Sequence, residues 1–187
     1  MGGLKRLLFL TGEPSVGKTT VFLKALEDLQ VLGYSVGGMV SREVRSCGER
    51  VGFEIVDLAD GIRGWLSHIN QRAGPQVGRY RVNLEDLERI GVAAIEKANE
   101  HYDVTAIDEV GPMEFCSTKF IQSVRDVVLG SKLVIGTIHM RAKHELASAI
   151  RARNDAGIFA VTLGNREHLH ETVVKEAVAF LSAKRLE

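Results

Sequence analysis

The stretch that decides the fold is Gly12-Glu13-Pro14-Ser15-Val16-Gly17-Lys18-Thr19, which Thr20 follows. It matches the pattern G-x-x-x-x-G-K-[ST] at every fixed position. An apolar run at 7–10 precedes it and a helical pattern follows, which is the strand–loop–helix context that the pattern requires. Glycines let backbone N–H groups turn towards a polyphosphate, and the next helix adds its unpaired N-terminal donors. The sequence therefore predicts that residues 12–20 bind phosphate; a chance glycine turn before a helix is the alternative.

Two side chains of this loop have predicted chemical roles. Lys18 would reach the β- and γ-phosphates of a nucleoside triphosphate, and the Thr19 hydroxyl would bind Mg²⁺. A second element, Asp108-Glu109, ends a predicted strand at 103–108. In enzymes with this loop, such an aspartate binds Mg²⁺ and a neighbouring glutamate deprotonates the attacking water. We therefore expect Thr19 and Asp108 to hold Mg²⁺, and Lys18 and Glu109 to be catalytic, unless the pair is an ordinary solvated strand end.

Composition narrows the class of protein. The 187 residues suit a single domain, 1–187, and the 24 basic residues balance the 24 acidic ones. Without a basic excess, nucleic acid is a disfavoured partner. The two cysteines, Cys47 and Cys116, are far apart and form neither a zinc motif nor a disulfide framework. No stretch approaches the roughly 18 apolar residues of a membrane span, so we expect no membrane contact and a cytoplasmic protein.

Periodicity predicts an α/β fold with a β-rich insert. Helices are expected at 18–32, 84–100, 117–130, 143–153 and 166–184, with Asn83 and Asn165 as caps of the second and last. Strands are expected at 4–10, 103–108, 132–138 and 158–163. Their alternation favours a mostly parallel sheet flanked by helices. Between 34 and 69, short β-rich runs separated by turns predict an antiparallel hairpin or meander, and 70–82 is expected to be a loop.

Several short motifs occur together along the chain. They are GEPSVGKTT at 12–20, SREVR at 41–45, GRYRVN at 78–83, IDEVGPME at 107–114 and GNRE at 164–167. In this order and spacing, nearly the whole chain resembles the thermophilic nucleoside-triphosphatase family, whose relatives include the cancer-related nucleoside-triphosphatase. The resemblance implies a P-loop fold of the additional-strand, catalytic-glutamate type. It also implies hydrolysis of NTPs, with ATP and GTP both accepted, with Gly12 to Thr19 as the phosphate site and Asp108 and Glu109 as the second site.

Other polar residues are weaker candidates. An arginine that stabilises charge on the γ-phosphate would come from Arg42, Arg45, Arg79, Arg81, Arg141, Arg151, Arg153 or Arg166. Arg141 is favoured because it follows the strand at 132–138, and Arg166 could flank the base. Thr137 and His139, at the same strand end, could sense the γ-phosphate or hold the attacking water, or serve only packing. For Glu114 there are two alternatives, a position near the metal or a solvated loop residue, and the second is favoured.

Three functions share this loop. The leading hypothesis is a Mg²⁺-dependent nucleoside-triphosphatase that forms NDP and phosphate. The alternatives are a small-molecule or nucleoside kinase, for which the insert at 34–69 would build the second pocket, and a slow nucleotide-dependent switch. The described motifs indicate no base preference, because an Asn-Lys-x-Asp base-reading run is absent from the sequence.

Overall fold

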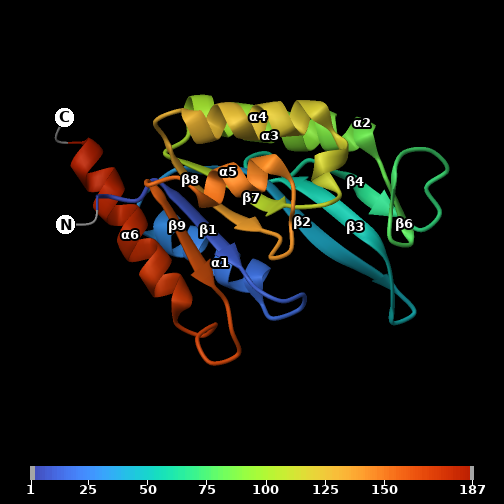
Figure 1. Ribbon diagram of the computed structural model, residues 1–187, viewed down its shortest axis with the longest axis horizontal. Coiled ribbons are helices and arrows are strands. Elements are labelled where there is room, and N and C mark those ends of the chain that lie inside the picture. The colour runs from blue at the N-terminus through green and yellow to red at the C-terminus, as the bar shows by residue number, and fades with distance from the viewer. Residues whose placement is uncertain (1–2, 186–187) are drawn as a thin grey trace.

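Helices and strands alternate through most of the chain in a computed structural model that describes residues 3–185 (Figure 1). The strands are β1 (Leu7–Thr11), β2 (Val36–Ser46), β3 (Glu49–Asp57), β4 (Arg63–His68), β5 (Gln76–Val77), β6 (Tyr80–Val82), β7 (Val104–Val110), β8 (Leu133–Ile138) and β9 (Ala156–Ala160). The helical elements are α1 (Lys18–Val31), α2 (Leu84–Asp86), η1 (Leu87–Val92), α3 (Ala93–His101), η2 (Glu114–Cys116), α4 (Thr118–Leu129), α5 (Glu145–Arg151) and α6 (Leu169–Lys184). Within residues 3–185, no helix combines the length and apolarity that a membrane crossing needs.

The strands of the described chain form one sheet in the order β5-β6-β4-β3-β2-β7-β8-β1-β9. Strands β2, β7, β8, β1 and β9 pair in parallel, and we call them the parallel half. Strands β3, β4, β6 and β5 pair antiparallel, and we call them the antiparallel half. Strand β8 lies between β1 and β7, which is the additional strand that the family resemblance implies. The predicted fold class is therefore confirmed, whereas the single domain over 1–187 stays a prediction.

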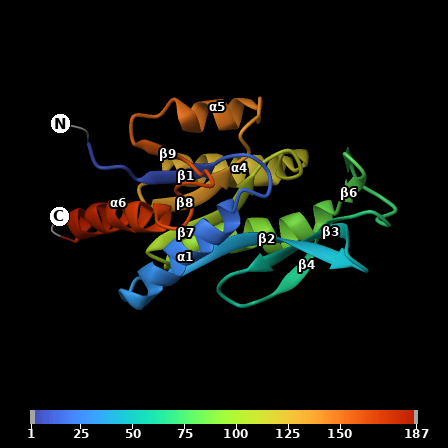
Figure 2. The same cartoon turned by 90° about the horizontal axis from the view of Figure 1, so that it is seen from below.

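Strand β2 joins the two halves. Its residues 36–40 pair in parallel with β7, and its residues 39–46 pair antiparallel with β3. The far end of β2 and its partner β3 project beyond the helical layers (Figures 1 and 2). The predicted antiparallel insert is thus an extension of the main sheet rather than a separate unit.

Helices cover both faces of the parallel half. One face packs under α3, α4 and α5, and the other under α1 and α6 (Figures 1 and 2). Along β1, Leu7 and Phe9 belong to the first core, and Leu8 and Leu10 belong to the second, because successive strand side chains point to opposite faces. A strand buried on both faces needs an unbroken apolar run, as residues 7–10 provide.

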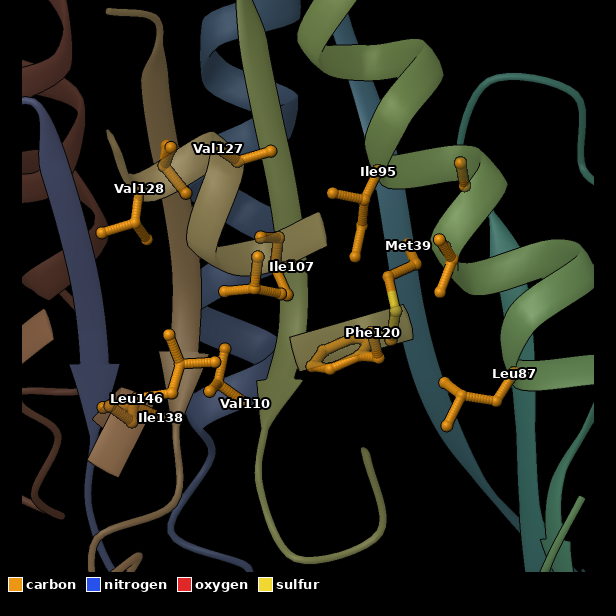
Figure 3. Packing of buried hydrophobic residues seen from close by; sticks show 14 of the residues in the cluster. Met39, Leu87, Ile95, Ile107, Val110, Phe120, Val127, Val128, Ile138 and Leu146 are labelled. Carbon is orange, nitrogen blue, oxygen red and sulfur yellow. The ribbon is translucent and has the colours of Figure 1, made fainter. Parts of the chain in front are cut away.

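The first core is filled by interlocking side chains from strands and helices. Figure 3 shows Ile107 and Val110 of β7 and Met39 of β2 beside Phe120 of α4, with Ile95 of α3 close by. Phe120, Ile107 and Ile95 are fully buried. This packing fixes β7, and therefore the residues at its end, against the helical layer.

Three predicted segments differ from the structure. The expected loop at 70–82 contains the hairpin β5–β6, whose two-residue turn begins at Gly78 with φ 60°. A glycine at this position allows the positive φ that tight hairpin turns require, so the glycines signalled a hairpin rather than a loop. The expected helix at 84–100 starts under Asn83, whose side chain accepts a bond from the Asp86 N–H at 3.2 Å, but it widens into π-helical turns over η1.

The third difference lies in the segment that connects β9 to α6. Strand β9 ends at Ala160 rather than at 163, and α6 begins at Leu169 rather than at 166. Asn165 does not cap this helix. Its side chain accepts a bond from the Thr162 N–H at 2.8 Å and donates to the Ala160 carbonyl at 2.9 Å. This asparagine closes a turn that removes residues from both the strand and the helix.

Candidate active site

The predicted phosphate loop connects β1 to α1 at the carboxyl end of the parallel strands. Gly12 and Gly17 have φ values of 154° and 107°, and a Cβ at Gly12 would lie 2.7 Å from the Val161 carbonyl oxygen. Both positions therefore require glycine. Helix α1 starts directly after Gly17, and no side chain of the described residues caps it. Its first N–H groups and the positive end of its dipole are consequently available to an anion.

Lys18 folds back over the loop. Its Nζ donates to the carbonyl oxygens of Gly12 at 3.1 Å and Glu13 at 3.3 Å. Both acceptors are neutral carbonyl oxygens of the loop itself. The lysine is therefore placed beside the site where the loop's N–H groups would hold phosphate.

Asp108 sits at the end of β7 and is buried, with 2% of its surface exposed. Its Oδ2 accepts a hydrogen bond from Thr19 Oγ1 at 3.0 Å, and its Oδ1 accepts one from Thr137 Oγ1. Burial raises the pKa of this carboxyl to about 6, the Thr137 bond opposes the shift, and the neighbouring Glu109 adds to it. The structure thus brings the phosphate loop, β7 and β8 together at one carboxylate.

Glu109 follows Asp108 and faces the same cavity. Burial raises the pKa of its carboxyl, while the Lys18 ammonium lowers it. Within the described part of the chain, Glu109 Oε1 is buried without a hydrogen-bond partner. A buried oxygen without a partner is costly, so this carboxylate is suited to accept a proton or a hydrogen bond from a molecule in the cavity.

The expectation for Glu114 is wrong. This side chain is buried, with 3% of its surface exposed, and lines the cavity beside the other two carboxylates. A Cβ at Gly111 would lie 3.3 Å from both Glu109 Oε2 and Glu114 Oε2, so the two carboxyl groups close around this glycine. Burial raises the pKa of Glu114 to about 8, and the charge of Glu109 adds to the shift. The turn at Gly111-Pro112 folds the chain back onto the site. The spacing between Asp108 and Glu114 in the sequence does not reveal this fold-back.

The three candidates at and after the end of β8, Thr137, His139 and Arg141, lie in the site or at its rim. Thr137 is buried and binds Asp108 directly. His139 lines the cavity, and burial lowers the pKa of its imidazole, as does the Lys18 charge. Arg141 is exposed and its Nη2 lies 3.2 Å from Glu13 Oε1 at the mouth of the loop. The structure therefore brings all three predicted residues to the phosphate loop.

The remaining arginine candidates separate by position. The Arg166 Cδ lies 3.6 Å from the place a Cβ would take at Gly17, so this side chain borders the loop on the α6 side. Arg151 caps the segment after β8 through the His139 and Ala142 carbonyls, and Arg153 pairs with Asp155. The other candidates lie on the projecting end of β2 and in the β5–β6 hairpin. Arg45 of β2 pairs with Glu43, and Arg42 of β2 is exposed. Arg79 binds the Tyr80 hydroxyl, and Arg81 donates to the Gly74 carbonyl.

Comparisons with known proteins show the family to which the chain belongs. A family model described as NTPase matches residues 7–174. The chain belongs to this NTPase family. A nucleoside-triphosphatase THEP1 of Thermofilum pendens is 41% identical over 92% of this chain and 96% of its own length. A cancer-related nucleoside-triphosphatase homolog of Bos taurus is 40% identical over 91% of this chain and 96% of its own. The crystal structure of THEP1 from Aquifex aeolicus is 32% identical, with a TM-score of 0.81, and the match covers 90% of this chain and 96% of that one.

The cavity of this NTPase-family chain extends further than the motifs suggested. It measures about 610 Å³ and runs from the phosphate loop past the carboxylates to the antiparallel half. Sequence reasoning missed its distant walls, which are Ser41, Glu43, Arg50, Phe53, Leu66, Val77, Tyr80 and Met113. Two of the quoted motifs, at 41–45 and 78–83, contain some of these residues. Those motifs were therefore a signal for the site, although they carried no recognisable chemistry.

Proposed function

We propose that this protein is a Mg²⁺-dependent nucleoside-triphosphatase that hydrolyses ATP, GTP and other NTPs to NDP and phosphate. Membership of the NTPase family, whose relatives are named nucleoside-triphosphatases, supports the hydrolase activity. The observation that carries the proposal is the contact between Thr19 Oγ1 and Asp108 Oδ2, because it unites the phosphate loop with the carboxylates of β7. The donors and acceptors of a triphosphate site thus converge on one cavity.

Residues 12–20 would bind the triphosphate. Their backbone N–H groups and the start of α1 would surround the phosphate oxygens, and Lys18 would exchange its two carbonyl partners for the β- and γ-phosphates. The exchange is favourable because a charged acceptor replaces a neutral one. Glu13, Pro14, Ser15 and Val16 would shape the loop, and Thr20 would add a hydroxyl at its end.

Thr19 and Asp108 would hold Mg²⁺. Their hydroxyl and carboxylate oxygens are the hard donors that this cation prefers, and the two already lie at hydrogen-bond distance. Within residues 3–185, no three or more His, Cys, Asp or Glu side chains form a group that could hold a metal ion by themselves. The substrate phosphates would supply the remaining oxygens. When bound, the cation would neutralise charge on the β- and γ-phosphates.

Glu109 would act as the general base. Its buried carboxylate is more basic than a solvated one, and Lys18 favours the ionised form that accepts a proton. Water positioned by Glu109 would attack the γ-phosphorus, and the NDP would leave. Thr137 would hold Asp108 in place, while His139 and Arg141 would stand at the mouth near the γ-phosphate.

Base tolerance follows from the groups that border the loop on its other side. A second cavity there is lined by Thr20, Lys24, Arg166 and Glu167, together with Gly17. Lys24, Arg166 and Glu167 are exposed. The planar guanidinium of Arg166 could stack on the face of any base without reading its edge. This arrangement supports acceptance of several NTPs.

Phosphate release tests the proposal. Wild-type protein should release phosphate from ATP, GTP, CTP and UTP with Mg²⁺, and the rate should fall at least about a hundredfold after chelation. Lys18→Ala should lose binding and turnover, with the exposed Lys175→Ala as its control. Glu109→Gln should keep nucleotide affinity and lose about a hundredfold or more in kcat, with the exposed Glu27→Gln as its control. Unchanged hydrolysis in Glu109→Gln would refute the role of that carboxylate.

A further inference from the structure

The cavity of about 610 Å³ extends beyond the place where the triphosphate, Mg²⁺ and attacking water of the proposed hydrolysis would lie, which is bordered by residues 14–20, Asp108 and Glu109. The part beyond Glu109 has apolar walls, formed by Phe53, Leu66, Val77, Tyr80 and Met113, and we call it the outer chamber. Neither phosphates nor water gain from such walls. The outer chamber therefore has the character of a site for a second, partly apolar molecule.

The outer chamber lies on the opposite side of the phosphate loop from the base. Arg166 and α6 border the loop beside β1 and β9, where the nucleoside of a triphosphate bound as proposed above would lie. Apart from Met113, which follows β7, the walls of the outer chamber are on β3, β4, β5 and β6, beyond β2 and β7 in the sheet. The carboxylates at the end of β7 stand between these two sides. A molecule in the outer chamber would consequently face the γ-phosphate of a triphosphate bound as proposed above, and the present inference rests on that site.

Arg50 and Glu43, which line the outer chamber, pair with each other, while Arg45 contacts Glu43 and Arg79 contacts Tyr80 from outside the lining. Arg50 Nη1 lies 2.8 Å from Glu43 Oε2, and Arg50 Nε donates to Tyr80 Oη at 2.8 Å. This guanidinium is also 5.4 Å from the centre of the Phe53 ring. Its positive charge is thus engaged by a carboxylate, a phenol and an aromatic face. With the Glu109 carboxylate also lining the cavity, an uncharged ligand suits this lining better than an anionic one.

The shape of the apolar walls favours a flat ligand. Phe53 and Tyr80 meet edge to face, with ring centres 5.5 Å apart and an interplanar angle of 74°. Met113, whose sulfur accepts a hydrogen bond from Ser67 Oγ at 3.2 Å, adds an adaptable side chain. Aromatic walls with a thioether are well suited to a planar ring. The Ser41 hydroxyl and the Glu43 carboxylate provide polar partners for the ligand's own polar groups.

We propose that the outer chamber binds an uncharged alcohol that carries a planar aromatic ring, and that its hydroxyl accepts the γ-phosphoryl group in place of water. The hydroxyl oxygen forms a bond to the γ-phosphorus. The bond from this phosphorus to the β,γ-bridging oxygen breaks, and its electron pair leaves with the NDP. The hydroxyl proton moves to the Glu109 carboxylate, and no group is oxidised or reduced. Hydrolysis is then the reaction that occurs when water occupies the acceptor position.

A transfer assay tests this activity. Wild-type protein is incubated with Mg²⁺ and [γ-³²P]ATP plus adenosine, guanosine, cytidine, uridine or pyridoxine, and labelled products are separated from phosphate by chromatography. The corresponding nucleoside monophosphates form the anionic arm. At least one neutral alcohol should be labelled about tenfold more than its phosphorylated counterpart. Phosphate release without any labelled alcohol, or label in the monophosphates alone, would overturn the inference and leave the triphosphatase intact. Failure to release phosphate would instead overturn the triphosphate site on which both proposals rest.

Variants locate the acceptor. Val77→Trp places a bulky side chain in the outer chamber, and the matched control is Val31→Trp on an 82% exposed position of α1. The ratio of labelled alcohol to released phosphate should fall at least about tenfold in Val77→Trp and stay unchanged in Val31→Trp. Glu43→Gln leaves Arg50 without its carboxylate, so it should shift labelling towards the monophosphates. Equal ratios in all these proteins would place the acceptor elsewhere.

Binding can be observed without turnover. In protein with ¹³C-labelled methionine methyl groups, adding each of the same alcohols reports on Met113 in the outer chamber and on the fully buried Met39 as an internal control. An alcohol that is labelled in the transfer assay should shift the Met113 resonance and not that of Met39. Val77→Trp should abolish the shift. A labelled alcohol that leaves Met113 unchanged would contradict binding in the outer chamber.

Discussion

The central strands β7 and β8 of the parallel half differ from the antiparallel half in how deeply their side chains are buried. Every residue of β8, and all of β7 except Glu109, is buried under helices. In the antiparallel half, β3, β4 and β5 expose at least one residue each, and β5 has only two residues. Thr137 and Asp108, which require fixed positions, are on β8 and β7. The walls of the outer chamber, apart from Met113, are on the antiparallel half. A rigid support for reacting groups thus adjoins a less buried wall that can adapt to a ligand.

The largest expected effect concerns the rigid half. Asp108→Asn should lower kcat about a thousandfold, because the amide is neutral and a poor Mg²⁺ ligand. The same change should raise the free energy of unfolding at pH 7 by ~1 kcal/mol or more, since burial has raised the pKa of this carboxyl to about 6 and its ionised form is destabilising. Turnover and urea denaturation measure the two effects. Loss of stability together with activity would show that Asp108 chiefly supports the fold.

A pair of phenylalanines compares the halves directly. Phe120→Ala removes a fully buried ring beneath β7, and it should reduce the free energy of unfolding by about 3–5 kcal/mol. Phe53 of β3 is only partly buried, so Phe53→Ala should cost roughly half as much. Urea denaturation of both variants gives the ratio. Equal losses would mean that the antiparallel half is as tightly packed as the parallel half.

The pH dependence of stability tests the raised pKa of the buried Glu114 carboxyl. Its pKa is raised from 4.5 to about 8 by burial and by Glu109, so between these values the folded protein binds more protons than the unfolded chain. Glu114 therefore stabilises the fold below pH 4.5, and its contribution declines as the pH rises towards 8, by at most about 1.4 kcal/mol per pH unit. Urea denaturation between pH 5 and 8 should show a flatter profile in Glu114→Gln. Parallel profiles for the two proteins would contradict a protonated Glu114.

The smallest effect is expected in the antiparallel half. Tyr80→Phe keeps the ring and removes the hydroxyl that accepts hydrogen bonds from Arg50 Nε at 2.8 Å and Arg79 Nε at 3.1 Å. Because both arginines keep other partners, the free energy of unfolding should fall by about 1 kcal/mol. Thermal and urea denaturation would detect it. A loss as large as that of Phe120→Ala would show that this hydrogen-bonded group organises the whole antiparallel half.

Local signals account for most of what the sequence predicted well. The loop at 12–20, the strands β7 and β8 and the antiparallel course after residue 36 all follow from patterns a few residues long. Element ends were less predictable. Asn165 has the composition of a helix cap, yet its side chain closes a turn to Thr162 and Ala160. Capping and turn closure use the same amide, and only the neighbouring backbone decides between them.

By itself, the sequence determined that a phosphate loop lies between a buried strand and a helix, and that two adjacent carboxylates end a later strand. Those features depend on contiguous residues, whose spacing sets their local geometry. Only the tertiary structure decided that Glu114 is buried beside them and that residues from 41 to 80 extend their cavity into an apolar chamber. Burial and charge depend on segments that are distant in the chain and meet only when the sheet assembles. The pKa values of the carboxylates, and the space for a second molecule, therefore belong to the fold rather than to any motif.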